Sequence, residues 1–417
     1  MNKHHRRRLH LLAFACACSV LAADAEVLDR PSGVKIGERL TLRPFVSMSV
    51  TYDSNVNPHS DIDKEDDFLW TISPSLWLHY NAETWSVILS GFYNYRQYFD
   101  SSHDYYNRHN FGEDLRWNWA NSTGTEKGWS LILGQSYQQI TAADDMTLDG
   151  GQNASGDSKQ FQLAGSVQRR FNQYWHGDLN ASYYWLKYDD DDRNSYTFYG
   201  WDRILVGAEA GFAPSKWTDF LLSGSYQYYN QDNAEGSSVV GASSQGYSLQ
   251  GGLGSYMTDR ISYRLLAGWS MFDYGDGAEK ANGFVYTASG NWKIGETWNT
   301  MLLASSYYQP SERQYSSQSR VDAFSWGIAK VMVRGKLRAT FDLRYRHETI
   351  ESVTDSNWDY ALDIWTGRLG VDYTLCRFLA LFAYAEYQKS MNDEAEKRNG
   401  AYDYDRWRIT AGFRVQY

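Results

Sequence analysis

The strongest candidates for chemistry in this sequence are arginines and carboxylates spaced by even numbers of residues. In a β-strand, residues two apart point to the same face, so such spacing gathers charge on one face. Arginines among carboxylates create a field that attracts anionic or polar solutes such as sugars. The alternative role is pairing between neighbouring strands. The candidates are Arg43, Arg338, Asp342, Arg344, Arg346, Asp359, Asp363, Arg406, Arg408 and Arg414, with Arg368 and Asp372 beside them.

Catalytic and metal-binding patterns are weak by comparison. Asp189 to Asp192 are four consecutive aspartates that offer oxygen ligands for calcium. No spaced calcium-loop pattern accompanies them, which favours a solvated loop tip. The histidines after residue 25 are scattered one per segment, and no nucleophile elbow or phosphate-binding glycine loop is present in the sequence. We therefore expect no enzymatic activity, metal or cofactor, although distant strands could still assemble a Ser-His-acid site.

The segments that carry these charges alternate apolar and polar residues from Leu40 to Tyr417. The last segment has Trp407, Ile409 and Ala411 on one face and its arginines on the other. Period-two alternation over ten to fifteen residues is typical of a strand whose two faces meet different solvents. Aromatic residues stand at the ends of the apolar faces, as expected where strand ends meet lipid headgroups.

Connections between these segments alternate in length. Long polar connections, of which Asp53 to Asp67 is one, alternate along the chain with short turns, of which Gly295 to Thr297 is one. Nine long connections and eight short turns predict an all-β fold, a transmembrane antiparallel β-barrel of about 18 strands, with 16 as the alternative. Short turns would face the periplasm and long loops the exterior. A change of apolar parity between Ile364 and Leu369 predicts a bulge. A secreted sandwich, solenoid or propeller is the competing fold.

The first residues predict secretion. Residues 1–8 include a basic run from Lys3 to Arg8, Leu9 to Ala22 is mostly apolar, and Ala23-Asp24-Ala25 is a small-x-small cleavage site. We expect a signal peptide at 1–25, a short periplasmic segment at 26–39 and the barrel at 40–417. Cys376 would then be the only cysteine of the mature chain, which excludes an internal disulfide. This organisation predicts the outer membrane of a Gram-negative bacterium.

Composition agrees with such a barrel. The mean hydropathy of −0.59 hides alternating faces, and aromatic residues make up 16% of the chain. The formal net charge is −10, and removal of the basic N-terminal segment makes the chain more acidic still. An acidic protein lacks the positive charge that neutralises phosphates, so we expect no nucleic-acid partner.

One part of the sequence resembles a known family. Residues Tyr52, Asp53 and Asn55 end the first strand and are followed by Asp66-Asp67-Phe68 and by Ile72-Ser73-Pro74-Ser75-Leu76. This order and spacing, with the aromatic segment from Tyr93 to Tyr98, is similar to the start of the putative β-barrel porin 2 family over about residues 46 to 110. For the Tyr52-Asp53-x-Asn55 motif itself we expect a strand-to-loop turn in which side chains satisfy nearby backbone groups.

The resemblance implies an outer-membrane barrel of about eighteen strands that is associated with export of capsular polysaccharide or exopolysaccharide. Such a barrel would be the exit pore, and a separate periplasmic export protein would feed it. Outer-membrane lipid, lipopolysaccharide and the outer-membrane assembly machinery, which reads a terminal motif such as Phe413-x-Val415-x-Tyr417, are the other expected partners. The alternatives are a diffusion porin for small anionic or sugar solutes, and a barrel enzyme or closed structural barrel.

Overall fold

The computed structural model describes residues 33–56, 64–102, 107–120, 128–140, 158–188, 200–215, 217–231, 243–255, 260–274, 280–309, 316–333, 335–352, 360–393 and 403–417. Nearly all of these residues are in strands. Within the described ranges, no helix is long and apolar enough to cross a membrane.

Nineteen strands are present in the described residues. In chain order they are β1 (Val34–Ile36), β2 (Leu40–Asp53), β3 (Asp67–Asn81), β4 (Trp85–Tyr98), β5 (Arg108–Ala120), β6 (Gly128–Ile140), β7 (Ser158–Arg170), β8 (Trp175–Tyr188), β9 (Trp201–Ser215), β10 (Thr218–Gln231), β11 (Ser243–Gly254), β12 (Ile261–Asp273), β13 (Ala281–Ile294), β14 (Trp298–Gln309), β15 (Ser316–Met332), β16 (Leu337–Ser352), β17 (Tyr360–Cys376), β18 (Leu379–Asn392) and β19 (Tyr404–Gln416).

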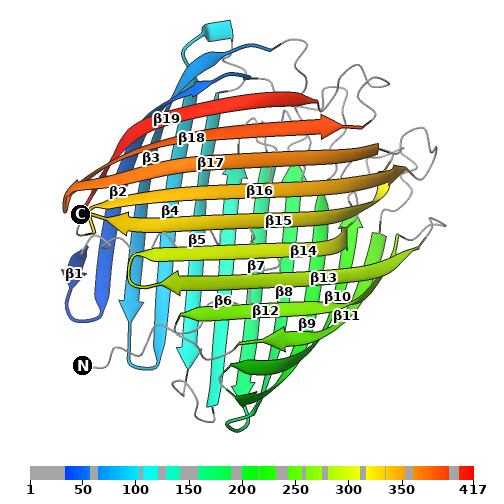
Figure 1. Cartoon of the computed structure of the whole chain (residues 1–417). Helices are drawn as coiled ribbons and strands as arrows, with labels where there is room; N and C mark the ends of the chain where they lie inside the picture. The colour runs from blue at the N-terminus through cyan, green and yellow to red at the C-terminus, as the bar shows by residue number, and fades with distance from the viewer. Residues whose placement is uncertain are drawn as a thin grey trace.

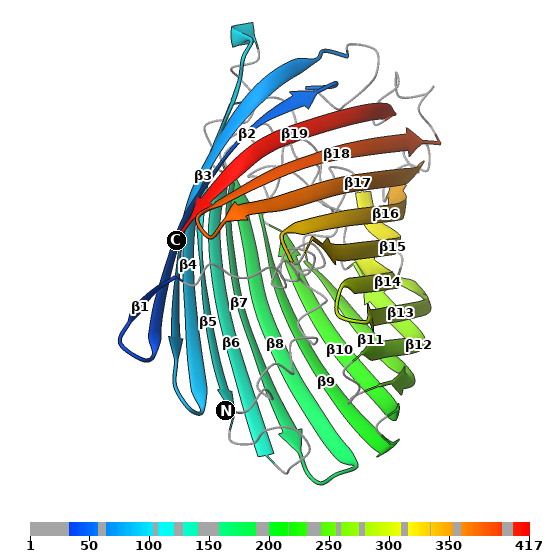
Figure 2. The same cartoon turned by 60° about the vertical axis from the view of Figure 1, so that its left-hand side comes forward.

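Strands β2 to β19 form one closed ring. Each pairs antiparallel with the next, and β19 pairs antiparallel with β2, which leaves no open edge between the first and last strands. Figures 1 and 2 show β4–β10 on one side and β12–β19 on the other, with the strands of the two sides crossing steeply. Strands on opposite sides of a tilted barrel cross in this way. The predicted antiparallel barrel of eighteen strands is confirmed.

The short strand β1 lies outside the ring. Val34 pairs with Leu42 and Ile36 with Leu40, so β1 runs beside β2 just beyond the point where Gln416 of β19 pairs with Phe45. The hairpin between β1 and β2 turns through Gly37, whose φ of 67° suits glycine. It therefore extends the sheet past the barrel at the end where the C-terminal residue of the chain lies.

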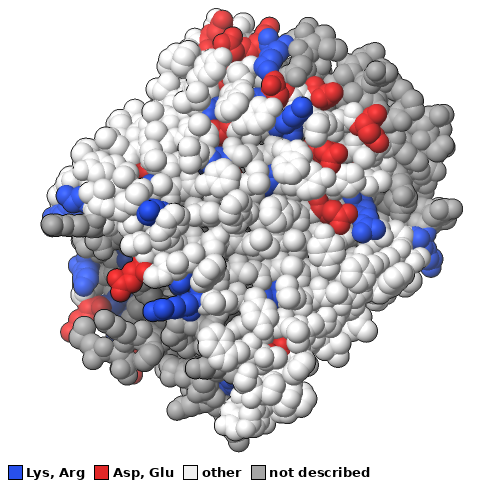
Figure 3. Space-filling view, viewed as in Figure 1, with Lys and Arg blue, Asp and Glu red and all other residues white. Residues whose placement is uncertain are grey.

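Alternation along β2 separates two environments. Val46, Met48 and Val50 are exposed on the outer face, whereas Ser47, Ser49 and Thr51 face the lumen. Because the bilayer is the apolar solvent of such a barrel, exposed apolar side chains are the expected outer surface. Figure 3 shows that the outer face over β12–β19 is mainly uncharged, with charged side chains gathered towards its margins.

The predicted bulge between Ile364 and Leu369 is absent. Strand β17 pairs with β16 in unbroken register from Tyr360 to Tyr373, and its irregularity lies at the other end, between Thr374 and Cys376. The parity change in the sequence has another cause. Inward-facing Tyr360 and Leu362 are buried against Ile350 of β16, so apolar residues occupy lumen-facing positions near the external end of β17.

Three inward-facing glycines mark two sharp bends of the sheet. A methyl group on Gly252 of β11 would overlap the carbonyl oxygen of Leu265, and one on Gly268 of β12 would overlap that of Leu249. On Gly412 of β19 it would overlap the carbonyl oxygen of Met48. The β11–β12 pair and the β19–β2 pair stand opposite each other in the ring. Glycine therefore lets neighbouring backbones approach at both bends, which divide the barrel into two curved halves.

Candidate functional site

The inward faces of β16 to β19 and β2 carry a dense set of charges, which we call the arginine wall. Register fixes the faces: Tyr345 and Trp365 pair on the outer side, where their tilted rings have centroids 4.4 Å apart, so residues of opposite parity point inward. Across these described strands, eight arginines face five carboxylates, an excess of three positive charges. The arginine wall comprises Arg43, Arg338, Arg344, Arg346, Arg368, Arg406, Arg408, Arg414, Asp53, Asp342, Glu348, Asp372 and Glu386.

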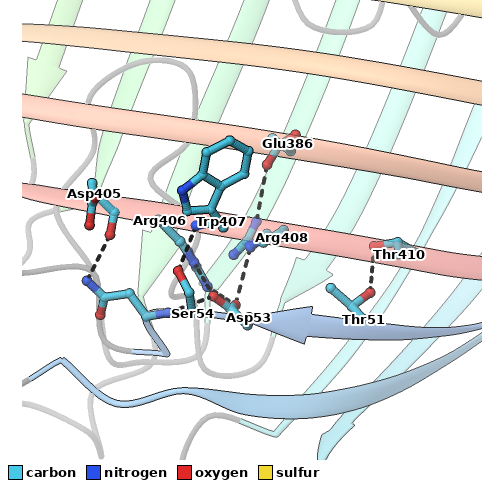
Figure 4. A network of polar contacts seen from close by, with 10 residues as sticks. Thr51, Asp53, Ser54, Glu386, Asp405, Arg406, Trp407, Arg408 and Thr410 are labelled. Carbon is cyan, nitrogen blue, oxygen red and sulfur yellow. Dashed lines mark hydrogen bonds and ion pairs between the residues drawn. The ribbon is translucent and has the colours of Figure 1, made fainter.

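One tight charge cluster of the arginine wall joins the first and last strands of the ring (Figure 4). Arg406 Nε donates to Asp53 Oδ1 at 2.7 Å, and its Nη2 donates to Asp53 Oδ2. Arg408 Nε donates to Asp53 Oδ2 at 3.3 Å, and Arg408 also lies 3.9 Å from Glu386. Asp53 and Arg406 are 0% and 2% exposed. A two-point guanidinium–carboxylate contact of this kind fixes orientation as well as charge.

The Tyr52-Asp53-x-Asn55 motif thus has a wider role than a local turn. The local contact is present, because the Asn55 N–H donates to Asp53 Oδ1 at 3.2 Å. Asn55 Nδ2 also reaches the carbonyl oxygen of Asp405 on β19, whereas the Tyr52 hydroxyl lies on the outer face and donates to Asp66 at 3.0 Å. The motif therefore closes the barrel as well as ending a strand.

Arginines on β16 are partly neutralised within the strand. Arg346 Nη2 donates to Glu348 Oε2 at 3.2 Å, and both side chains are buried. Asp342 pairs in register with Arg368 of β17, and Arg338 pairs with Asp372. The interleaved carboxylates lower the local positive charge without cancelling it, so the face keeps a positive potential towards the lumen.

Two aromatic rings interrupt the charges on β18. Phe382 and Tyr384 face the lumen and stack with their centroids 6.3 Å apart and their planes 12° from parallel. The guanidinium carbon of Arg368 lies 3.9 Å from the centre of the Tyr384 ring, and that of Arg414 lies 5.7 Å from the centre of the Phe382 ring. Cations at these distances interact with the negative ring face.

The opposite side of the lumen is mostly neutral and polar. Around the ring, β7 stands nine strands from β16 and β6 stands eight, and their inward faces carry mainly glutamine and serine, with the buried Arg170 at one end of β7. Gln138 donates to Asn110 of β5 at 3.2 Å, and Ser130 donates to Gln168 at 3.3 Å. We call this surface the amide wall; it comprises Ser130, Ser136, Gln138, Gln160, Gln162, Ser166 and Gln168. A field therefore runs across the lumen, from the arginine wall to the amide wall.

Asp363 corrects the sequence prediction. It shares the outer face of β17 with Trp365, where it accepts hydrogen bonds from the Tyr345 hydroxyl at 2.6 Å and lies 3.0 Å from His347 Nδ1. Apolar Leu362 and Ile364 take the inward positions on either side, so counting parity from apolar residues assigned Asp363 to the wrong face. Asp359 and the run from Asp189 to Asp192 lie outside the described residues.

Alternation along β18 does not predict the aromatic pair, for a related reason. Leu381, Phe382 and Tyr384 place apolar side chains on both faces of β18, so alternation alone does not say which ring faces water. The feature that marks Phe382 as lumen-facing is its neighbour on β19, because the inward-facing Gly412 lies directly opposite it.

A closed antiparallel ring with an apolar outer surface and a charged lumen defines a β-barrel channel of the outer membrane. The chain belongs to the family described as "Putative beta-barrel porin 2", which matches residues 30–417. Nearly the whole chain is included in that match, well beyond the region whose motifs suggested it.

Solved structures with a similar fold are distant in sequence. The siderophore receptor PirA from Pseudomonas aeruginosa is 8% identical, with a TM-score of 0.43 over 92% of this chain and 81% of the receptor. The FrpB iron transporter from Neisseria meningitidis is 9% identical, with a TM-score of 0.45 over 86% of this chain and 62% of the transporter. The outer membrane protein OpdK from Pseudomonas aeruginosa is 12% identical, with a TM-score of 0.43 over 90% and 99%. No curated protein matches the chain.

Proposed function

We propose that this outer-membrane channel is the exit pore for a capsular polysaccharide or exopolysaccharide. The observation that carries the proposal is the pair of unlike walls, with arginines on one side of the lumen and amides and hydroxyls on the other. A polysaccharide offers hydroxyls along its whole length and, in many cases, carboxylates. Such a chain can exchange water for weak contacts on both walls without a deep binding site, as conduction requires.

A diffusion porin for small anionic or sugar solutes is the second candidate. The excess of arginine in the lumen favours it, because fixed positive charge raises the local concentration of anions. The two functions differ in direction and in the size of the solute. Export requires a feeding partner on the periplasmic side, which we propose to be a separate polysaccharide export protein.

The proposal includes the route of the chain to its membrane. We propose that residues 1–25 are removed as a signal peptide, that residues 26–39 lie in the periplasm, and that the assembly machinery recognises the C-terminal strand. Lipopolysaccharide and outer-membrane lipid would then contact the apolar outer face.

Deletion of the gene tests the export function. In the deletion strain we expect surface polysaccharide to be lost while intracellular precursor synthesis continues, because only the exit step is removed. Surface polysaccharide is measured by staining intact cells and by quantifying cell-associated and released sugar. A strain that expresses the Arg344→Glu variant from a plasmid separates pore chemistry from the mere presence of the protein. Normal surface polysaccharide in the deletion strain would refute export and favour the diffusion porin.

A further inference from the structure

Glycines on the two neighbouring strands lie opposite the aromatic pair on β18. Gly412 of β19 is directly opposite Phe382, and a methyl group on Gly412 would lie 2.7 Å from Phe382 Cζ. On β17, Gly370 is opposite Tyr384, and a methyl group there would lie 3.6 Å from Tyr384 Cβ. The Phe382 ring thus extends sideways over Gly412 along the wall, and a flat ring on the wall presents one face to the lumen.

Arginines flank this aromatic surface at two points. Arg368 lies over the Tyr384 ring, and Arg414 lies beside the Phe382 ring. Arg368 is exposed, and Arg414 is partly exposed. Each guanidinium has five N–H donors in a planar fork that matches a carboxylate. The surface therefore joins an apolar, electron-rich face to carboxylate-binding donors within the span of two adjacent rings.

We propose that Phe382, Tyr384, Arg368 and Arg414, the Phe382 platform, bind acidic sugar residues of the uronic acid class. The C–H face of a pyranose ring carries weakly positive hydrogens, and it packs against the negative face of an aromatic ring. The carboxylate of the same residue can accept two parallel hydrogen bonds from a guanidinium. A small inorganic anion would use the arginines alone, and a neutral sugar would use the ring alone, so the combination selects an acidic saccharide.

This inference rests on the proposed saccharide channel and names its substrate class. The neighbouring charges are consistent with repeated contacts along a polymer. Glu386 faces the lumen two residues beyond Tyr384 on β18, with Arg408 opposite it on β19, and Arg344 and Arg338 lie on the neighbouring strand β16. An acidic chain leaving the platform therefore meets further guanidinium groups in both directions along the arginine wall.

Binding to the purified full-length barrel in detergent tests the proposal. The probe is fluorescein-labelled hexagalacturonate, followed by fluorescence anisotropy at low ionic strength. We expect Arg368→Gln to weaken binding about tenfold, through loss of one charge-assisted contact. Phe382→Leu should weaken it about fivefold by removing the flat ring. Labelled maltohexaose should bind more weakly, respond to Phe382→Leu and be insensitive to Arg368→Gln.

Two matched variants serve as controls. Phe92 of β4 faces the lumen over Gly112, as Phe382 does over Gly412, and Phe92→Leu should leave binding unchanged. Arg320 of β15 is on the outer face, and Arg320→Gln should also have no effect on binding. Migration of unheated samples on a gel shows that each variant is folded before binding is measured.

Binding that changes less than twofold in both Arg368→Gln and Phe382→Leu would overturn the platform. So would displacement of the probe by citrate with equal efficiency in the wild type and in Phe382→Leu, because that result would mean simple attraction of anions. Failure of the export function looks different. A deletion strain with normal surface polysaccharide refutes export even where the purified barrel binds the probe as expected.

Discussion

At the scale of single residues, Asp53 joins several contacts at the closure of the barrel. It is fully buried, and it accepts hydrogen bonds from Arg406, Arg408 and the backbone of Asn55. Buried charges of this kind are held at a substantial desolvation cost, which only well-placed partners offset. Removal of one partner therefore costs more than the intact pair contributes.

The Asp53→Asn variant is expected to destabilise the barrel by about 3–5 kcal/mol, because it leaves Arg406 buried without its counter-charge. Urea unfolding in detergent micelles, followed by far-ultraviolet circular dichroism, measures the change in the free energy of unfolding. Asp66→Asn is the control, since Asp66 makes an exposed hydrogen bond to Tyr52 and its loss should cost about 0.5 kcal/mol or less. Equal unfolding curves for wild type and Asp53→Asn would contradict the role of this cluster.

Lumen-facing residues were predictable from the sequence where alternation is strong. On β16 from Leu337 to Tyr345, and on β19 from Trp407 to Val415, the outer positions are aromatic or aliphatic, and the inward arginines stand out against them. On β17 the pattern fails, because inward positions near the external end are apolar and buried, as Leu362 is. Burial inside the lumen depends on tertiary packing, which the alternation pattern does not show. Because the buried inward residues are apolar, the pattern placed Asp363 on the inner face, although the backbone of β17 is regular there.

At the scale of elements, the two bends decide how the strands form a barrel. Gly252 and Gly268 on adjacent strands each stand against a backbone carbonyl, and Gly412 does so at the opposite bend. Arg264 of β12 reaches Glu209 of β9 across two intervening strands, with Nη1 to Oε1 at 2.8 Å, which is possible because the sheet bends tightly between them. The glycines of the β11–β12 bend and the ion pair between Arg264 and Glu209 thus support the same local curvature of the sheet.

The Gly268→Ala variant should impair folding severely, because its methyl group would overlap the carbonyl oxygen of Leu249 and the backbone cannot yield as a side chain can. The folded fraction after refolding into micelles is read from the gel mobility of unheated samples. Gly367→Ala is the matched control, because a methyl group there would have no neighbour within 4 Å. A Gly268→Ala protein that refolds as efficiently as Gly367→Ala would show that the bend tolerates a side chain.

Connection lengths made the number of strands predictable, because loops and turns alternate along the chain whatever the shape of the barrel. The bends were not predictable in the same way. Glycine in a strand also marks bulges and simple weak points, and only the pairing of β11 with β12 brings Gly252 and Gly268 together.

At the scale of the whole molecule, an acidic protein has a lumen with an arginine-rich wall. The formal net charge is −10, yet the described inward faces of β16–β19 and β2 carry an excess of positive charge. Net charge therefore says little about the ions that a channel prefers. What a solute meets is set by the strands whose polar faces line its path.

The purified channel is expected to prefer anions. In planar bilayers with a potassium chloride gradient, the reversal potential should lie closer to the equilibrium potential of chloride than to that of potassium. Arg344→Glu should reduce the chloride-to-potassium permeability ratio by about half or more, because it reverses one fixed charge in the lumen. Arg320→Glu, on the outer face, should leave the ratio unchanged. Cation preference in the wild type would mean that the arginine wall does not govern permeation.

The contact between Asp53 and Arg406 also depends on the register in which β19 pairs with β2. The two residues are 353 positions apart, and they meet only where β19 pairs with β2 to close the ring. A slip of one residue between β19 and β2 would turn Arg406 and Arg408 towards lipid and leave Asp53 without a cation. A slip of two would move both guanidinium groups along the strand, away from their present contacts. The present register between β2 and β19 is therefore the one that gives Asp53 both of its guanidinium partners.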